Sequence, residues 1–454
     1  MNETAIIESQ QAAGSAAVDA YARKGKVTFF LLLLFTIVLF VRPSDFLLMP
    51  LRVAEFLAVA VILSYVVARM QGAYPFIWTK ELKLMLALTG WFIVGVPFAF
   101  WRTNSLTILT ENWLKTIVIF FLLTQTVLTL GRVRKLLWIL VLCMSTVFVY
   151  TIVTYGAMAA EIDERIMGDT KGFLSGNHAG IAAAMIIPFI AALLSVSRSF
   201  LQTVVLLASL GAAAWMAILT ASRAGALAVF VSVAVTWLFI LRGSIRARFF
   251  GVVCAAGLGL AIAAAPGIFW MRLSTLWVEP SVVQTDEQRS ATESTAQRRA
   301  LLVRSIHYTL EDPIFGLGLG NFPIASGART GDAQSWKNTH NTFTQISSEA
   351  GIPGLIMFIM LLGHSMRQLW RLGKRQDRHT PLTDLQVLSK ATLISIGCFA
   401  FAGLFAGLAY DYYLYYLIAL GVGLQGAAAN QHEQSFPELA ESREPQPAME
   451  GAER

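Results

Sequence analysis

Residues 340–370 read HNTFTQISSEAGIPGLIMFIMLLGHSMRQLW and join a polar segment to an apolar helix. The apolar part, residues 351–370, has about the 20 residues that an α-helix needs to cross the hydrocarbon core of a bilayer. His340 precedes that helix, so an imidazole that can exchange a proton near neutral pH lies at the edge of a predicted membrane helix. The stretch therefore predicts a membrane protein with proton-transfer chemistry at one membrane face.

The whole chain has the composition of an integral membrane protein. Of its 454 residues, 56% are hydrophobic and 14% are charged, and the mean hydropathy is +0.61. A soluble domain of this size must cover itself with charge, which excludes that class. We predict an all-α integral membrane protein with about twelve transmembrane helices. The apolar runs lie near residues 27–41, 51–69, 84–101, 114–130, 135–157, 178–196, 202–221, 224–241, 248–270, 351–370, 389–409 and 412–428.

The Lys and Arg residues predict the orientation. The first 26 residues are polar and no cleavage site follows the first apolar run, so the N-terminus is expected in the cytoplasm. Basic residues then collect in alternate short connections, which marks these as cytoplasmic. The net charge of +7 is spread over separate loops and does not indicate a nucleic-acid-binding face. The four connections left outside are 102–113, 158–177, the turn at Ser222-Arg223, and about 271–350.

The predicted organisation is one bundle with a single large periplasmic insertion. Its parts are a cytoplasmic tail (1–26), a bundle of helices 1–9 (27–270), a periplasmic loop with short surface helices (271–350), helices 10–12 (351–428) and a disordered cytoplasmic tail (429–454). Within the insertion, residues 282–297 are polar and are expected to form a mobile loop.

The second half of the insertion has helical periodicity. Leu302, Ile306 and Leu310 recur at helical spacing, which predicts a helix lying on the membrane surface or capping the bundle. That helix should stop at Asp312-Pro313. The glycines of residues 316–320 follow a helix instead of a strand, so they predict a flexible turn and not a nucleotide site.

Arginines near the outer membrane face are candidates for binding an anion. Arg223 lies between two apolar runs, where a guanidinium is costly unless it pairs with an anion. The simpler alternative is an arginine that reaches toward lipid headgroups. Arg299, with Arg298 beside it, begins the surface helix at a similar level. Two guanidinium groups facing one site can bind phosphate oxygens through paired hydrogen bonds.

His340 is the candidate for proton transfer, although a histidine before a helix is also a common interfacial or capping residue. Three external carboxylates, Glu349, Asp312 and Asp332, are candidates for orienting it, and the sequence does not choose among them. The remaining histidines are weaker candidates: His178, His307, His364, His379 and His432. The three cysteines fall inside predicted helices without metal-ligand spacing, so no metal site is predicted.

Taken in order, these elements resemble the bacterial O-antigen ligase family. His340-Asn341, followed after nine residues by Gly351-Ile-Pro-Gly354, resembles the H[NSQ]-x9-GxxG pattern of that family. The Ser222-Arg223-Ala-Gly segment is also similar, as is Arg299 placed thirteen residues before Asp312-Pro313. The layout agrees as well, with about twelve helices, both termini inside and one large periplasmic loop before the last three helices.

The resemblance covers most of residues 27–428 and implies glycosyl transfer without a metal, nucleotide or other cofactor. The implied donor is a glycan linked to undecaprenyl pyrophosphate, at the periplasmic face of the inner membrane. We expect Arg223 and Arg299 to bind the pyrophosphate, and His340 to act as general base in an inverting transfer. Asn341, Arg298 and Glu349 are expected to support the site.

The acceptor stays open at this point. Lipid A–core, as in an O-antigen ligase, is favoured over a growing glycan, as in an O-antigen or exopolysaccharide polymerase, and over a protein Ser or Thr, as in an O-oligosaccharyltransferase. A lipid or glycan transporter is the alternative from another class, but transporters often show two related halves around a midplane site, whereas here the polar residues gather in one loop. Residues 173–178 are expected at most to contact sugar, and Asp411 is not placed in the active site.

Overall fold

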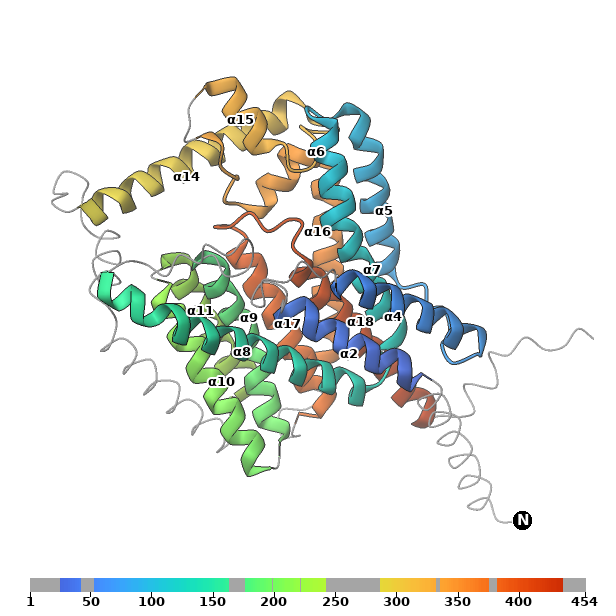
Figure 1. Cartoon of the computed structure of the whole chain (residues 1–454). Helices are drawn as coiled ribbons and strands as arrows, with labels where there is room; N and C mark the ends of the chain where they lie inside the picture. Colours follow the sequence, from blue (N-terminus) through green and yellow to red (C-terminus); the bar gives the residue numbers. More distant parts are fainter. Residues whose placement is uncertain are drawn as a thin grey trace, which may run out of the picture.

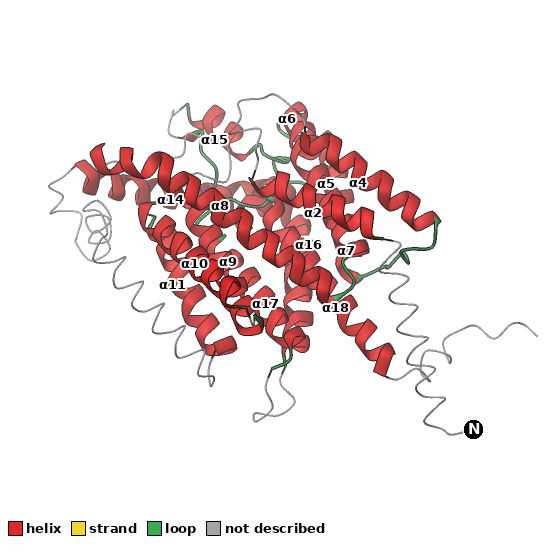
Figure 2. Cartoon of the chain, turned by 60° about the horizontal axis from the view of Figure 1, so that its bottom comes forward, coloured by secondary structure: helices red, strands yellow, loops and turns green. Residues whose placement is uncertain are grey.

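The computed structural model describes residues 25–41, 53–162, 176–197, 199–220, 222–241, 286–331, 335–374 and 382–435, and every regular element in these ranges is helical (Figures 1 and 2). The first helices are α2 (Lys26–Val41), α4 (Val53–Met70), α5 (Lys80–Gly95), η1 (Val96–Phe98), α6 (Arg102–Thr107), η2 (Ile108–Trp113), α7 (Leu114–Thr126), α8 (Leu130–Ile162) and α9 (Gly176–Val196). They are followed by α10 (Phe200–Leu219), α11 (Arg223–Thr236), η3 (Trp237–Leu241), α14 (Asp286–Glu311), α15 (Phe322–Thr330), α16 (Thr342–Gly373), α17 (Asp384–Ala402) and α18 (Tyr412–Ser435). The prediction of an all-α protein is confirmed for this part of the chain.

The helices have the length and composition of membrane spans. Within the described ranges, eight are long and apolar enough to cross a membrane, and Lys26–Val41 and Ala224–Ile240 are shorter apolar helices. Each predicted run except the ninth, at 248–270, falls on a helix. That run, the first 24 residues and the tail after 435 lie outside the described residues. The protein is thus a multi-pass membrane protein, and the count of twelve spans stays a prediction.

Helix α9 lies inside the bundle, where it packs against α8, α10, α11 and α17. Its side chains from Ala179 to Leu193 are nearly all buried, and many are alanines. Small residues let helix backbones approach closely in a membrane. A Cβ added to Gly180 would lie 2.8 Å from the Cα of Gly225 in α11, so this crossing depends on two glycines. The crossing fixes the starts of α9 and α11 relative to each other.

Helices α14 and α15 and the segments that join them to α16 form a head at one end of the bundle (Figure 1). The head has its own apolar cluster of Leu301, Tyr308, Leu317, Phe322 and Ala325. The guanidinium of Arg304 donates hydrogen bonds to Ser326 (2.6 Å) and Ser335 (2.9 Å). Because α14 also packs against α16, the helix predicted at this position caps the bundle.

Two helix boundaries differ from the prediction. Helix α14 begins at Asp286, so the mobile loop predicted for 282–297 is wrong from that residue onward. Acidic residues at a helix start complement its dipole, and Glu, Gln, Ala and Arg favour helix; polar composition shows only that a segment is not buried. Helix α18 continues to Ser435 instead of ending at 428, through a run of alanines with high helix propensity.

The glycines at 316, 318 and 320 form a turn, as predicted, with φ values of +64°, +85° and +69°. Positive φ suits glycine because other residues carry a Cβ that clashes. The turn is not free: Leu317 N donates to Ser348 O (2.8 Å) and Gly318 N donates to Glu349 O (2.9 Å). These backbone bonds hold the turn against the first part of α16.

Helix α16 is broken at Gly351, directly after the residues that bond to the glycine turn, with φ +70° and ψ −178°. The next residue, Ile352, donates its N–H to Pro313 O at 2.8 Å. The hydrogen bonding within α16 is therefore interrupted where the glycine turn packs against it. Backbone groups of α16 and of the residues around the glycine turn pair with each other instead. The Gly-x-x-Gly part of the sequence motif thus has a structural role in docking the head on the bundle.

Candidate active site

His340 lies in the turn that leads from the head into α16. It is half-buried, and it is the non-glycine residue with positive φ (54°) in the described ranges. The following residue, Asn341, caps α16, since its Oδ1 accepts hydrogen bonds from Phe343 N (2.9 Å) and Thr344 N (3.0 Å). The His-Asn pair of the motif therefore places an imidazole directly beside a fixed helix start.

The surroundings keep the imidazole of His340 neutral. Burial, as the largest cause, and the charges of Arg298 and Lys337 together with the neighbouring His178 lower its pKa to about 4. The unperturbed value for histidine is about 6.5. At neutral pH this imidazole is therefore unprotonated, and its unprotonated ring nitrogen is free to interact with a hydroxyl proton.

The charge of Arg298, in α14, acts on His340. Lys337, three residues before the histidine, donates a hydrogen bond to Gln297 at 3.0 Å and so joins the turn to this part of α14. Arg298 is partly buried, whereas Arg299 is exposed. By helical phase, Arg299 shares its face with Val303 and Ile306, which are 61% and 47% exposed. The structure thus shows the effect of Arg298 on His340, whereas the binding of pyrophosphate by Arg299 stays a prediction.

Arg223 is the first residue of α11, and Ser222 caps that helix by accepting a hydrogen bond from Gly225 N at 3.1 Å. The side chain of Arg223 lies outside the described part. Its backbone position follows from the contact of Gly225 with Gly180, because Arg223 and His178 each precede their glycine by two residues. Since the charge of His178 acts on His340, the start of α11 lies at the same end of the bundle as His340.

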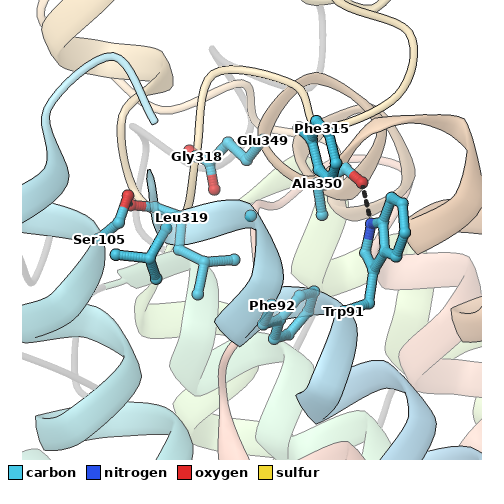
Figure 3. A pocket seen from close by; sticks show the side chains of 10 residues that line it. Trp91, Phe92, Ser105, Phe315, Gly318, Leu319, Glu349 and Ala350 are labelled. Atoms are coloured by element: carbon cyan, nitrogen blue, oxygen red, sulfur yellow. Dashed lines mark hydrogen bonds between the residues drawn. The ribbon is translucent and has the colours of Figure 1, made fainter. Parts of the chain in front are cut away.

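Glu349 is buried (1% exposed), and its carboxylate has partners other than His340. Its Oε2 accepts hydrogen bonds from the Tyr410 hydroxyl (2.6 Å) and from Gly320 N (3.0 Å), and its Oε1 accepts one from Phe322 N (3.1 Å). It lines a small cavity beside the glycine turn, where Trp91 Nε1 donates to Ala350 O at 2.8 Å (Figure 3). Glu349 thus ties α16 to the glycine turn and to the connection before α18.

The other two carboxylates proposed to orient the histidine give no further support. Asp312 is exposed at the end of α14. Asp332 lies outside the described ranges. In the residues that the structure describes, no group of three or more His, Cys, Asp or Glu side chains could hold a metal ion.

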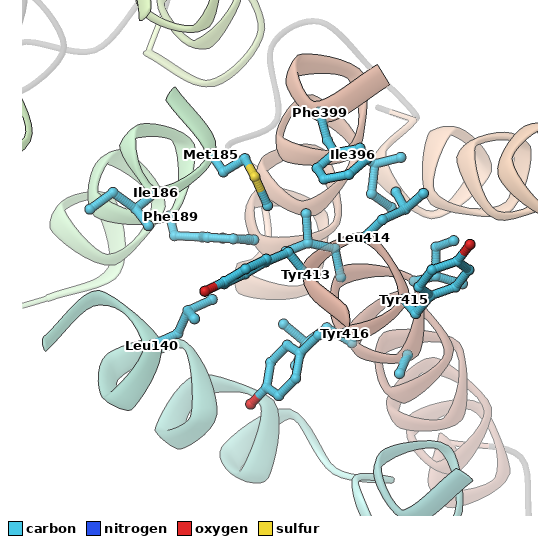
Figure 4. Close-up of a cluster of buried hydrophobic side chains, with 14 of the residues drawn as sticks. Leu140, Met185, Ile186, Phe189, Ile396, Phe399, Tyr413, Leu414, Tyr415 and Tyr416 are labelled. Carbon is cyan, nitrogen blue, oxygen red and sulfur yellow. The ribbon is translucent and has the colours of Figure 1, made fainter. Parts of the chain in front are cut away.

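The structure also brings together His178, a weaker candidate by sequence, and Asp411, which was not placed in the active site. Burial raises the pKa of Asp411 and the charge of His178 lowers it, so the two side chains are neighbours. An apolar cluster that includes Leu140, Phe189 and Tyr416 joins α8, α9 and α18 (Figure 4). Both residues lie at helix starts on the predicted outer side of the membrane. This position is the feature by which the sequence could have pointed to them. The sequence does not show which helix starts become neighbours.

Part of the chain is similar to a known protein family. A search of curated proteins found no match. A family model described as O-antigen ligase matches residues 208–359, about a third of the chain. The matched region includes the start of α11, the head, His340 and the break at Gly351, but it ends before the connection that carries Asp411. The family matched over residues 208–359 is the one that the sequence motifs resemble.

Proposed function

We propose that this protein transfers a glycan from undecaprenyl pyrophosphate to an acceptor hydroxyl at the periplasmic face of the bacterial inner membrane. Lipid A–core is the favoured acceptor, which would make the protein an O-antigen ligase. The observation that carries the proposal is the neutral, half-buried imidazole of His340 beside the charge of Arg298, within the region that matches the family. Polymerases and protein O-oligosaccharyltransferases would use the same donor and differ in the acceptor.

Positive charge would act on the donor. Negative charge grows on the pyrophosphate as the bond from the sugar C1 to oxygen breaks, and preorganised positive groups stabilise that charge in the transition state. We assign this role to Arg223 and Arg298, with Arg299 as a more distant contributor. Guanidinium groups suit it because they stay charged and can donate paired hydrogen bonds to phosphate oxygens. The proposal needs no metal ion for this step.

His340 would act on the acceptor. The acceptor oxygen attacks C1 from the face opposite the pyrophosphate, and His340 takes the hydroxyl proton as the new C1–O bond forms. The electron pair of the broken bond leaves with undecaprenyl pyrophosphate, and His340 later returns its proton to water. Attack from the opposite face inverts the configuration at C1.

The direct test is transfer by the purified protein, with mass analysis of the product. Incubation with undecaprenyl-pyrophosphate glycan and lipid A–core should give a product whose mass is the acceptor plus the glycan. Gene deletion separates the two leading alternatives: loss of a ligase leaves long lipid-linked chains that are not joined to core, whereas loss of a polymerase leaves single repeat units on core. Glycan movement across proteoliposomes without bond formation would instead support a transporter.

The two neighbouring arginines of α14 should have unequal effects. Arg298→Ala should lower kcat/KM about 100-fold, because one of the positive groups at the leaving pyrophosphate is lost. Arg299→Ala should lower it no more than about fivefold, as expected for an exposed charge in high dielectric. Steady-state kinetics of the two purified variants tests this order, and a larger effect at Arg299 would contradict the assignment.

The pH profile of kcat/KM should follow the free-enzyme pKa of His340. The base works when neutral, so activity should stay level from about pH 8 down to about pH 5 and fall as the pH drops through about 4. An acid limb near the unperturbed value of about 6.5 would mean that the imidazole is solvated and unaffected by its neighbours. In His340→Gln this limb should disappear from the residual activity.

A further inference from the structure

The backbone of His340 is in a conformation that needs support. Its φ of 54° lies in the left-handed region, which costs a residue with a side chain about 1–2 kcal/mol unless the surroundings hold it there. Such residues cluster at active sites because they aim a side chain where ordinary backbone cannot. The question is which groups hold this turn.

Thr339 holds this turn through two hydrogen bonds to the residue that follows the histidine. Its hydroxyl donates a hydrogen bond to Asn341 O at 2.9 Å and accepts one from Asn341 N at 3.3 Å. The hydroxyl therefore bridges across His340 and closes a small ring that contains the histidine backbone. Thr339 is buried, at 1% exposure, so water does not compete for these bonds.

The residues after the histidine attach this ring to the connection between α17 and α18. Thr342 N donates to Gly403 O (2.7 Å), and Thr342 Oγ1 donates to Ala406 O (2.7 Å) and accepts from Leu408 N (3.1 Å). Asn341 Nδ2 donates to Leu404 O at 3.2 Å. The connection Gly403–Ala409 thus supports the turn, and this connection lies outside the region that matches the family.

Thr339 differs from its neighbours in what its hydroxyl does. Asn341 caps α16 and Thr342 joins two chain segments, so replacing either would disturb the fold. In the described ranges both hydrogen bonds of the Thr339 hydroxyl go to Asn341 and fix only the histidine backbone. A Cβ at Gly407 would lie 3.6 Å from this hydroxyl, so the connection Gly403–Ala409 packs close to the hydroxyl.

We infer that Thr339 is a positioning residue for glycan transfer: its hydroxyl keeps His340 in the left-handed conformation that holds the imidazole half-buried at the site. The inference rests on the proposed role of His340 as general base. Without the hydroxyl the turn should relax, and the imidazole should move toward solvent and away from the acceptor. A displacement of about 1 Å at a reacting group can cost on the order of 100-fold in rate.

The test compares Thr339→Val, which keeps the shape and removes the hydroxyl, with Thr339→Ser, which keeps the hydroxyl. We expect Thr339→Val to lower kcat by about 10- to 100-fold with little change in the donor KM, and Thr339→Ser to stay within about threefold of wild type. If Thr339→Val does not fold, Thr339→Ala replaces it, and thermal unfolding in detergent checks each variant. Wild-type kcat in Thr339→Val, or an equal loss in Thr339→Ser, would overturn the inference.

A titration provides a readout that does not require activity. The groups whose charges act on His340 are Arg298 of α14, Lys337 of the same turn and His178 of α9, which in turn is next to Asp411. NMR of ¹⁵N-histidine-labelled protein should show the pKa of His340 rising from about 4 toward about 6.5 in Thr339→Val and unchanged in Thr339→Ser. An unchanged pKa in Thr339→Val would contradict the positioning role even if glycan transfer itself were absent, so failure of the proposed function can be recognised separately.

Discussion

Replacement of His340 by alanine is expected to lower kcat for glycan transfer by about 10²- to 10⁴-fold, the range typical for loss of a general base. The imidazole is neutral at working pH because burial and the charges of Arg298 and Lys337 oppose its protonation. Alanine cannot take the acceptor proton, so the hydroxyl would have to attack while still protonated. Donor binding should change little, since it depends on the arginines.

The measurement needs both turnover and binding. Single-turnover transfer by purified protein reports the chemical step, and titration with undecaprenyl-pyrophosphate glycan reports donor affinity. His307→Ala is a matched control, because His307 is on the same head, is 67% exposed and pairs with Glu311 at 3.2 Å. That variant should transfer glycan at nearly the wild-type rate. Full activity of His340→Ala would refute the assigned base.

Replacement of Gly351 by alanine is expected to prevent the head from docking on the bundle. The φ and ψ of Gly351, +70° and −178°, lie in a region that only glycine enters readily. An alanine Cβ would lie 2.8 Å from Pro313 O and closer still to the carbonyl of Ile314. These backbone atoms directly precede the glycine turn, and Pro313 O accepts the hydrogen bond from Ile352 N, so they cannot move without breaking bonds to α16. We expect a loss of about 3 kcal/mol or more of stability.

The loss should be visible as low yield of folded protein, a lower Tm in detergent and faster proteolysis within residues 286–341. Gly363→Ala is the matched control, because Gly363 is in the same helix with nothing within 4 Å of its added Cβ. That change should leave the Tm unchanged or raise it slightly, since alanine favours helix. A Gly351→Ala variant with wild-type Tm and proteolysis pattern would show that the turn can dock in another way.

Much of the architecture could be predicted from the sequence because membrane helices are long, apolar and continuous, and these properties are local. The run at 351–370, for example, falls within α16 and the run at 178–196 falls within α9. The start of α14 was missed for the converse reason: residues 286–297 are polar, and local composition does not distinguish an exposed helix from a loop.

The candidate site, like the fold, could be predicted from the sequence only in part. His340, Arg223 and the glycines could be found from motifs, because each has an unusual residue type at a membrane edge. Whether Arg298 or Arg299 faces the rest of the head depends on how α14 is rotated about its axis. The sequence around the two arginines does not show this rotation. The partners of Glu349 are Gly320 and Tyr410, which are 29 and 61 residues away along the chain.

The sequence by itself determined that this is an α-helical membrane protein and singled out a histidine and arginines in the connections between its helices, because hydrophobic length and residue type act locally. Only the tertiary structure decided which of these groups meet. Helix α9 brings His178 to His340, the glycine turn fits the break in α16, and Thr339 holds the histidine in a left-handed backbone over the connection before α18. These contacts depend on close packing between distant segments, which is the part of the free energy that a single stretch of sequence does not contain.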